Sequence, residues 1–64
     1  MEIVLIRLVT GDRVIGVMTQ NGYGMVILYA PMLIKAYEDD TYLFSQYEPM
    51  SSSSLGVFYI HNIV

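Results

Sequence analysis

The stretch Ile6–Met18 constrains the fold of this chain more than any other segment. Two apolar runs rich in β-branched residues flank Gly11-Asp12, and Gly and Asp accept the positive φ that tight hairpin turns need. We therefore expect residues 2–9 and 13–20 to form a β-hairpin about this turn. Gly16 interrupts the second run, which indicates a bend or a close backbone approach, as at the corner of a small curved barrel.

The predicted hairpin is apolar on both faces, whereas an ordinary hairpin needs only one apolar face. Successive side chains of a strand point to opposite faces, so the position of the turn decides which residues share a face. With the turn at Gly11-Asp12, one face carries Val4, Ile6, Leu8, Ile15 and Val17, and the other carries Ile3, Leu5, Val9, Val14 and Met18. One of these faces is left over once the domain has formed its own core.

The composition indicates a partner for that second face. The 64 residues form a single domain, 1–64, and a domain of this size buries only about 60% of its unfolded surface. The chain has no cysteine for a disulfide, is 55% hydrophobic and is only 14% charged, where about 25% is usual. We therefore expect a homo-oligomer rather than a monomer.

No segment has the pattern of a membrane span or a targeting signal. Arg7, Gly11-Asp12 and Arg13 interrupt the longest apolar candidate, which falls short of the roughly 18 residues that a membrane helix needs. The N-terminal sequence Met-Glu-Ile-Val lacks the basic residues that begin a secretion signal. The expected location is the cytoplasm, without contact to a membrane.

The rest of the chain predicts further short strands and no helix. Their expected positions are Met25–Tyr29, Met32–Tyr37, Tyr42–Tyr47 and Val57–Ile60, separated by turns at Asn21–Gly24 and Glu38–Asp40 and by a Ser-rich connection over residues 48–54. Pro31 cannot donate to a ladder and marks a kink or an edge, and Gly56 is expected at a loop boundary. The apolar ending Asn62-Ile63-Val64 indicates either the start of a last strand or a fragment of a longer chain. The expected fold class is all-β: a small, strongly bent, antiparallel five-stranded barrel.

Two patterns, one toward each end of the chain, carry a resemblance to a known family. Residues 58–63, Phe-Tyr-Ile-His-Asn-Ile, resemble the second motif of the Sm-like proteins in the Tyr-Lys-His form typical of bacterial Hfq. The pattern Ile6-x-Leu8-x-x-Gly11, followed by Gly16, Met18 and Met25, resembles the first motif of that family. The resemblance implies an SH3-like, Sm-like barrel assembled into a ring, with RNA bases bound around the pore. Divergent Sm-like proteins encoded by bacterial viruses are more similar to this pattern than any standard RNA chaperone.

The chain also departs from the family pattern. Val26 stands where Sm-like proteins place an Asn that hydrogen-bonds a base edge, and Ile60 stands in place of the Lys of the Tyr-Lys-His motif. Gly22 replaces an expected Asp, the usual N-terminal helix is missing, and residues 32–50 form a longer excursion than the family core requires. The polar groups missing at Val26 and Ile60 are those that a base-reading pocket would use.

The resemblance implies a nucleic-acid site formed by His61, Met25, Tyr59 and Asn62. An imidazole at a pore can donate to phosphates or base edges and gains charge below about pH 6.5. The alternative for His61 is a structural role, capping a turn between strands. Met25 can stack softly on a base or can simply fill the core. For most of the six tyrosines we favour subunit interfaces over base stacking, since tyrosine combines an apolar ring with a hydroxyl that tolerates water.

Few cations are available for phosphates. The net charge is −3, and only Arg7, Arg13 and Lys35 are basic, although a ring would turn one cation per subunit into a circle of cations. Arg7 lies on an apolar face of the hairpin, where we expect an inter-subunit carboxylate as its partner rather than a phosphate.

Nothing in the sequence indicates catalysis. The chain has one His and no Cys, and its carboxylates fall in turns rather than in one pocket. Glu38–Asp40 lacks the spacing of a calcium loop and is expected to be a solvated turn. We expect a non-enzymatic protein without metal or cofactor.

Two functions from different classes remain open. The first, by resemblance, is a ring that binds RNA or other single-stranded nucleic acid. The second is a scaffold ring for protein–protein assembly that has lost the RNA site, which Val26 and Ile60 favour.

Overall fold

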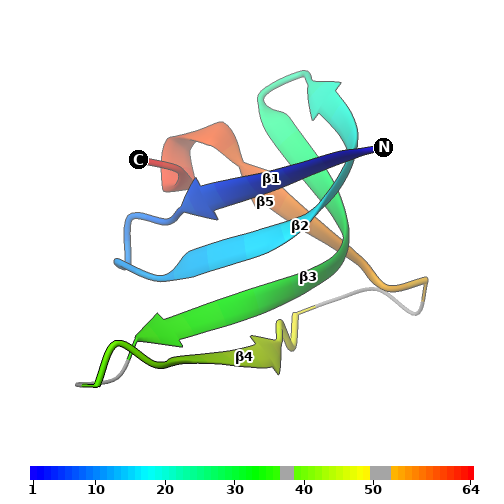
Figure 1. Ribbon diagram of the computed structural model, residues 1–64. Helices are drawn as coiled ribbons and strands as arrows, with labels where there is room; N and C mark the ends of the chain where they lie inside the picture. The colour runs from blue at the N-terminus through cyan, green and yellow to red at the C-terminus, as the bar shows by residue number, and fades with distance from the viewer. Residues whose placement is uncertain (37–38, 50–52) are drawn as a thin grey trace.

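The computed structural model describes residues 1–36, 39–49 and 53–64, and in these the chain is all-β (Figure 1). The strands are β1 (Glu2–Arg7), β2 (Arg13–Gly22), β3 (Met25–Ala36), β4 (Tyr42–Gln46) and β5 (Leu55–Tyr59), followed by a single 3₁₀ turn, η1 (Ile60–Asn62). The expected fold class, all-β with a small and strongly bent antiparallel sheet of five strands, is confirmed, although the sheet does not close into the predicted barrel.

The long strand β3 organises the sheet. It pairs with β2 along one side, and on its other side its first half pairs with β5 and its second half with β4. Pro31 lies at the changeover, between the last β5 pair at Tyr29 and the first β4 pair at Met32, where a missing N–H costs no ladder bond. The Pro31 carbonyl accepts the N–H of Tyr47 at 3.1 Å. The two segments that the sequence predicted here are therefore one kinked strand, and Tyr37 lies outside the described residues.

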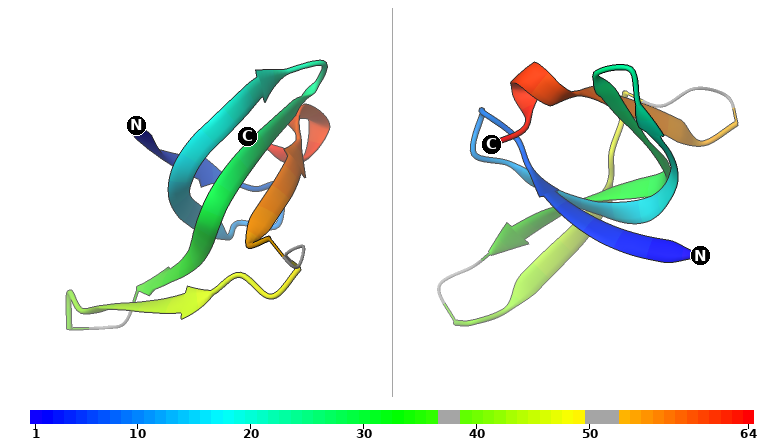
Figure 2. Two further views of the ribbon diagram at one scale, coloured as in Figure 1. Left: turned by 90° about the vertical axis from the view of Figure 1, so that its right-hand side faces the viewer. Right: turned by 90° about the horizontal axis from the view of Figure 1, so that it is seen from above.

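The kink of β3 coincides with the bend of β2 at Gly16, as expected. Ile15 pairs with Met32 and Val17 with Tyr29, so Ala30 and Pro31 together oppose Gly16 as a β-bulge. A Cβ on Gly16 would lie 3.1 Å from the Leu28 Cβ and 3.3 Å from the Pro31 Cα. The absence of a side chain at Gly16 thus allows β2 and β3 to bend together, and Figure 2 shows both strands curving around the core.

The turn of the first hairpin differs from the prediction. The Leu8 N–H donates to the Asp12 carbonyl at 2.8 Å and the Gly11 N–H donates to the Leu8 carbonyl at 2.9 Å, so the loop has three residues, Val9-Thr10-Gly11. Gly11 adopts φ +94°, which completes the loop as a bulge. Ile6 consequently pairs with Val14, whereas a turn at Gly11-Asp12 would pair it with Val17. The register differs from the prediction by three residues, an odd number, which exchanges the faces as a shift of one residue does.

A slip of one residue moves every side chain of one strand to the other face. The predicted grouping of faces is therefore wrong, although both faces are indeed apolar. The inner face carries Val4, Ile6, Leu8, Val14 and Met18, and the outer face carries Ile3, Leu5, Ile15 and Val17, while Val9 lies in the loop.

The core lies inside the bend of the sheet. Leu8, Val14, Leu28 and Phe58 are buried, and the Tyr47 ring packs on Phe58 with 5.0 Å between ring centroids. Gly56 also belongs here: it lies within β5, not at the predicted loop boundary, and a Cβ at this position would lie 2.9 Å from the Pro31 Cγ. A glycine is needed there because β5 passes directly over the Pro31 ring.

The sheet does not close into a complete barrel, and the end of the chain pairs with the first hairpin. Ile63 forms a bridge with Leu8, flanked by hydrogen bonds from Val9 N–H to the Asn62 carbonyl and from Val64 N–H to the Arg7 carbonyl, each 2.8 Å. This pairing sets the position of η1.

Candidate nucleic-acid interface

The second hairpin brings Met25 to the interface. Its turn consists of Tyr23 and Gly24, both with positive φ, 54° and 76°, so that β2 runs on to Gly22 and β3 begins at Met25. Met25 then pairs with Tyr59 of β5, and the Ile60 N–H donates to the Gly24 carbonyl at 2.9 Å. Directly opposed residues of an antiparallel pair share a face, so the Met25 and Tyr59 side chains are neighbours on the outer face.

Beyond Tyr59 the chain turns through η1, which is held by the Ile63 N–H donating to the Ile60 carbonyl at 3.0 Å. His61 lies within this turn and is exposed. Its imidazole stacks on the Tyr59 ring, with 5.9 Å between ring centroids and 21° between ring planes. The structure thus brings together His61, Tyr59 and Met25, the last of which is half-buried beside Tyr59 and does not belong to the core cluster.

Asn62 is separated from the stacked pair. A 3₁₀ helix has three residues per turn, so the Asn62 side chain leaves η1 about 120° away from that of His61. The Asn62 side of η1 faces a cavity of about 250 Å³, which Tyr59 also lines. Its other lining residues are Leu8, Val9, Thr10, Tyr47, Val57 and Phe58.

The sequence analysis missed Val9 and Thr10 of the first hairpin loop as neighbours of the predicted site. They reach it because Asn62 and Ile63 pair with the end of that hairpin. No local signal in either segment indicates this pairing, since the two segments lie at opposite ends of the chain.

The departures from the Sm-like pattern have different structural consequences. Val26 pairs with Phe58 and packs against the core, where an amide would replace an apolar contact. Ile60, in contrast, is 53% exposed at the start of η1. The interface therefore offers aromatic and thioether surface with the His61 imidazole as its polar group.

The described residues contain no group of three or more His, Cys, Asp or Glu side chains able to hold a metal ion. No helix within the described ranges is long and apolar enough to cross a membrane. No protein-family model matches the chain, and no curated protein matches it at a significant level. The functional assignment therefore depends on the chemistry of the residues themselves.

Proposed function

We propose that this protein is a homo-oligomeric, Sm-like, non-catalytic module that binds single-stranded RNA at the outer face beside η1. The observation that carries the proposal is the exposed stack of Tyr59 and His61 next to Met25. A stacked, solvent-facing pair of rings offers a platform for a nucleobase, and stacking of this kind tolerates any base because every base has a π-face. The cavity lined by Tyr59 and Asn62 provides space beside that platform.

The proposed role of His61 is to supply the positive charge at this site. A neutral imidazole offers one N–H donor, whereas a protonated one offers two donors and a full charge for phosphate. In an oligomer that charge is repeated once per subunit. Binding is therefore expected to be tighter at about pH 5.5 than at about pH 8, because only the protonated imidazole carries this charge.

Strand edges support the homo-oligomer. The Ile60 N–H donates to the Gly24 carbonyl and the Ala30 N–H donates to the Ser54 carbonyl, so every second residue of β5 bonds to β3. The N–H and C=O groups of Val57, which lies between such residues, therefore point away from β3. The same alternation directs the peptide groups of Ile3 and Leu5 away from β2. Edges of this kind invite pairing with another chain, and ring closure satisfies them.

The test combines the mass of the particle with its RNA affinity. Sedimentation at micromolar concentration should give a species larger than the 7.3 kDa chain. Fluorescence anisotropy with short A-rich and U-rich RNAs should show tighter binding at pH 5.5 than at pH 8, and His61→Ala should remove this pH dependence without changing the mass. Thr41→Ala, a substitution at an exposed residue just before β4, is the matched control. A folded monomer, or a pH dependence that survives His61→Ala, would contradict the proposal.

A second candidate function is a scaffold ring that assembles proteins without RNA. The outer face of β1 and β2 favours it, because Ile3 and Leu5 are 65% and 57% exposed there, and exposed apolar patches are typical of protein–protein contact surfaces. The same experiment separates the two candidates. An intact oligomer that binds neither RNA in low salt at either pH supports the scaffold.

A further inference from the structure

The outer face of β4 carries a row of side chains that the fold does not use. Tyr42, Phe44 and Gln46 alternate along the strand on one face, and each is exposed. Same-face residues of a strand are about 6.6 Å apart, because each residue adds about 3.3 Å. The Tyr42 and Phe44 rings are 58% and 53% exposed, so two aromatic surfaces lie in water at regular spacing.

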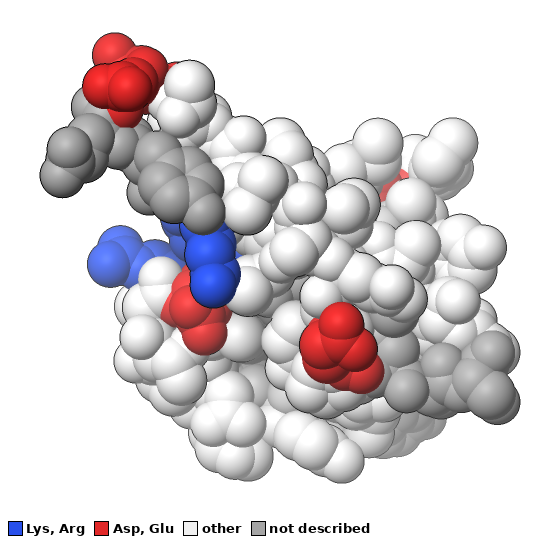
Figure 3. All heavy atoms as spheres, turned by 90° about the horizontal axis from the view of Figure 1, so that it is seen from below, with Lys and Arg blue, Asp and Glu red and all other residues white. Residues whose placement is uncertain are grey.

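Cations gather at the Tyr42 end of this row. Arg7 and Arg13 are directly opposed across β1 and β2, and the Arg13 guanidinium carbon lies 6.0 Å from the centre of the Tyr42 ring. Like charges placed opposite each other destabilise a sheet. Among the described residues no carboxylate forms an ion pair with either arginine. Figure 3 shows the Lys and Arg atoms of this view on one side of the molecule, with Asp or Glu atoms directly beside them.

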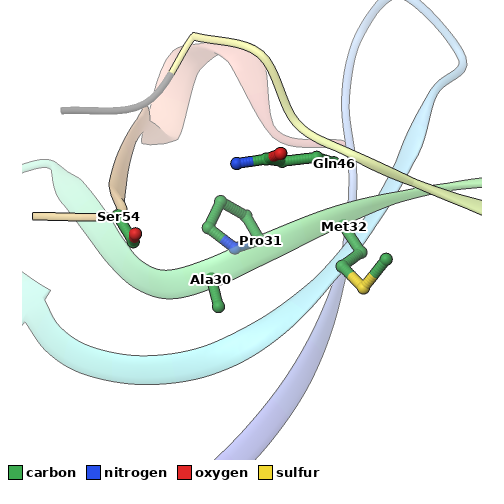
Figure 4. Close-up of a pocket in the computed structure, with 5 residues that line it drawn as sticks. All are labelled: Ala30, Pro31, Met32, Gln46 and Ser54. Atoms are coloured by element: carbon green, nitrogen blue, oxygen red, sulfur yellow. The ribbon is translucent and has the colours of Figure 1, made fainter. Parts of the chain in front are cut away.

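A cavity lies at the Gln46 end of the row. It has a volume of about 270 Å³ and forms where β3 leaves β5 for β4, lined by Ala30, Pro31, Met32, Gln46 and Ser54. Figure 4 shows the Gln46 amide directed from β4 toward the Ser54 side of the cavity. Within the described part of the chain the Gln46 amide has no hydrogen-bond partner, so its donors and acceptor are available to a ligand.

We propose that these residues form a second binding site for single-stranded nucleic acid, the β4 strip, defined by Gln46, Phe44, Tyr42, Arg13 and Arg7. One base enters the cavity, where the Gln46 amide can pair with its edge, as Gln does with adenine. Neighbouring bases stack on the Phe44 and Tyr42 rings, and the two guanidiniums hold phosphates. For Arg7 the phosphate takes the place of the inter-subunit carboxylate that the sequence led us to expect. The two arginines, which form no ion pair within the described residues, are the reason to expect a polyanion on this face rather than a neutral peptide.

This inference rests on the ligand class of the proposed function but shares no residue with the Tyr59, His61 and Met25 interface. The two sites therefore make different predictions. The β4 strip contains no histidine, so its contribution does not change between pH 8 and pH 5.5. It does depend on salt, because two phosphate contacts on a single strand give a slope of log K against log salt of about −1.4.

The experiment compares three double variants at pH 8 in low salt, using a labelled single-stranded RNA and a DNA of the same sequence. One of them, Tyr59→Ala with His61→Ala, removes the ring stack of the proposed interface at η1. Tyr42→Ala with Phe44→Ala removes the stacking surfaces of the strip, and we expect a loss in affinity of about tenfold or more. Arg7→Gln with Arg13→Gln should flatten the salt dependence. Tyr23→Ala, which removes a 95% exposed tyrosine at the second hairpin turn, is the matched control.

The outcomes separate the two sites. Unchanged affinity in the Tyr42/Phe44 variant, with loss in a Tyr59→Ala/His61→Ala variant, overturns the β4 strip and leaves the proposed function standing. The reverse pattern supports the strip and overturns the interface at η1. A Tyr42/Phe44 variant that changes the sedimenting mass instead of the RNA affinity shows that this face contacts protein, which also overturns the strip. Circular dichroism confirms that each variant is folded.

Discussion

Two parts of the sheet differ sharply in how closely their residues are packed, although β3 runs through both. The first is the bend, where β2, β3 and β5 meet at Gly16, and the second is the β3–β4 arm, formed by the second half of β3 and by β4. At the bend, β2, β3 and β5 approach so closely that two glycines are required: a Cβ on Gly16 or Gly56 would lie 3.1 or 2.9 Å from its nearest neighbour. In the arm, four of the five β4 residues are exposed and none is buried. Figure 2 shows this arm extending away from the curved part of the sheet.

This difference indicates where the free energy of folding arises. The buried side chains Leu8, Val14, Leu28 and Phe58 all belong to the bend or to the first hairpin. The arm adds strand hydrogen bonds but little buried apolar surface, so its outward side chains are free to vary without loss of the fold. The residues that stabilise the domain and the residues of the β4 strip are thus separated along β3.

The largest expected effect is at the centre of the bend. Leu28→Ala removes a fully buried side chain and should lower the free energy of unfolding by about 2–5 kcal/mol, enough to unfold much of a domain this small. Phe44→Ala in the arm should change it by no more than about 0.5 kcal/mol. Urea denaturation followed by circular dichroism measures both. Equal losses at the two positions would remove the distinction between bend and arm.

An intermediate effect is expected at the two glycines. A methyl group on Gly56 would lie 2.9 Å from the Pro31 ring and 3.0 Å from the Phe58 ring, and one on Gly16 would lie 3.1 Å from the Leu28 Cβ and 3.3 Å from the Pro31 backbone, so the surroundings must shift at both positions. Gly56→Ala and Gly16→Ala should each destabilise the protein by about 1–3 kcal/mol. Ser45→Ala in β4 is the control, with a change near zero. A neutral result at Gly56 would mean that β5 does not pass as closely over Pro31 as its geometry indicates.

The smallest effect is expected at the arginine pair. Arg7→Gln relieves the repulsion from Arg13 and should raise stability by about 0.2–1 kcal/mol in low salt. The gain should fade as salt rises, since exposed charges are screened. Thermal unfolding at about 0.01 M and about 1 M salt measures it. A destabilised variant would show that Arg7 has a stabilising partner and would weaken the case for the β4 strip.

The sequence predicted the parts of the fold that depend on local patterns. Alternating β-branched residues indicated the strands, Gly16 indicated the bend, and Pro31 indicated the kink in β3. The prediction for Gly56 was wrong. Its neighbours in the sequence are a Ser-rich segment, which is typical of a loop boundary, and nothing local indicates that β5 passes over the Pro31 ring at this residue. The candidate site was found only in part, since Val9 and Thr10 reach it through pairing between the two ends of the chain.

The sequence by itself determined that this protein is a sheet with two apolar faces and one sharp bend, because side-chain alternation and the missing Cβ of Gly16 are properties of neighbouring residues. Only the tertiary structure decided the register of the first hairpin. Thr10, Gly11 and Asp12 are compatible with loops of two or three residues. The three-residue loop is adopted because its register places Val14 on the same buried face as Leu8. Tertiary structure likewise decided which strands border each half of β3 and that η1 presents His61 stacked on Tyr59. These features depend on contacts between distant residues, and such contacts are selected by the packing of the whole core.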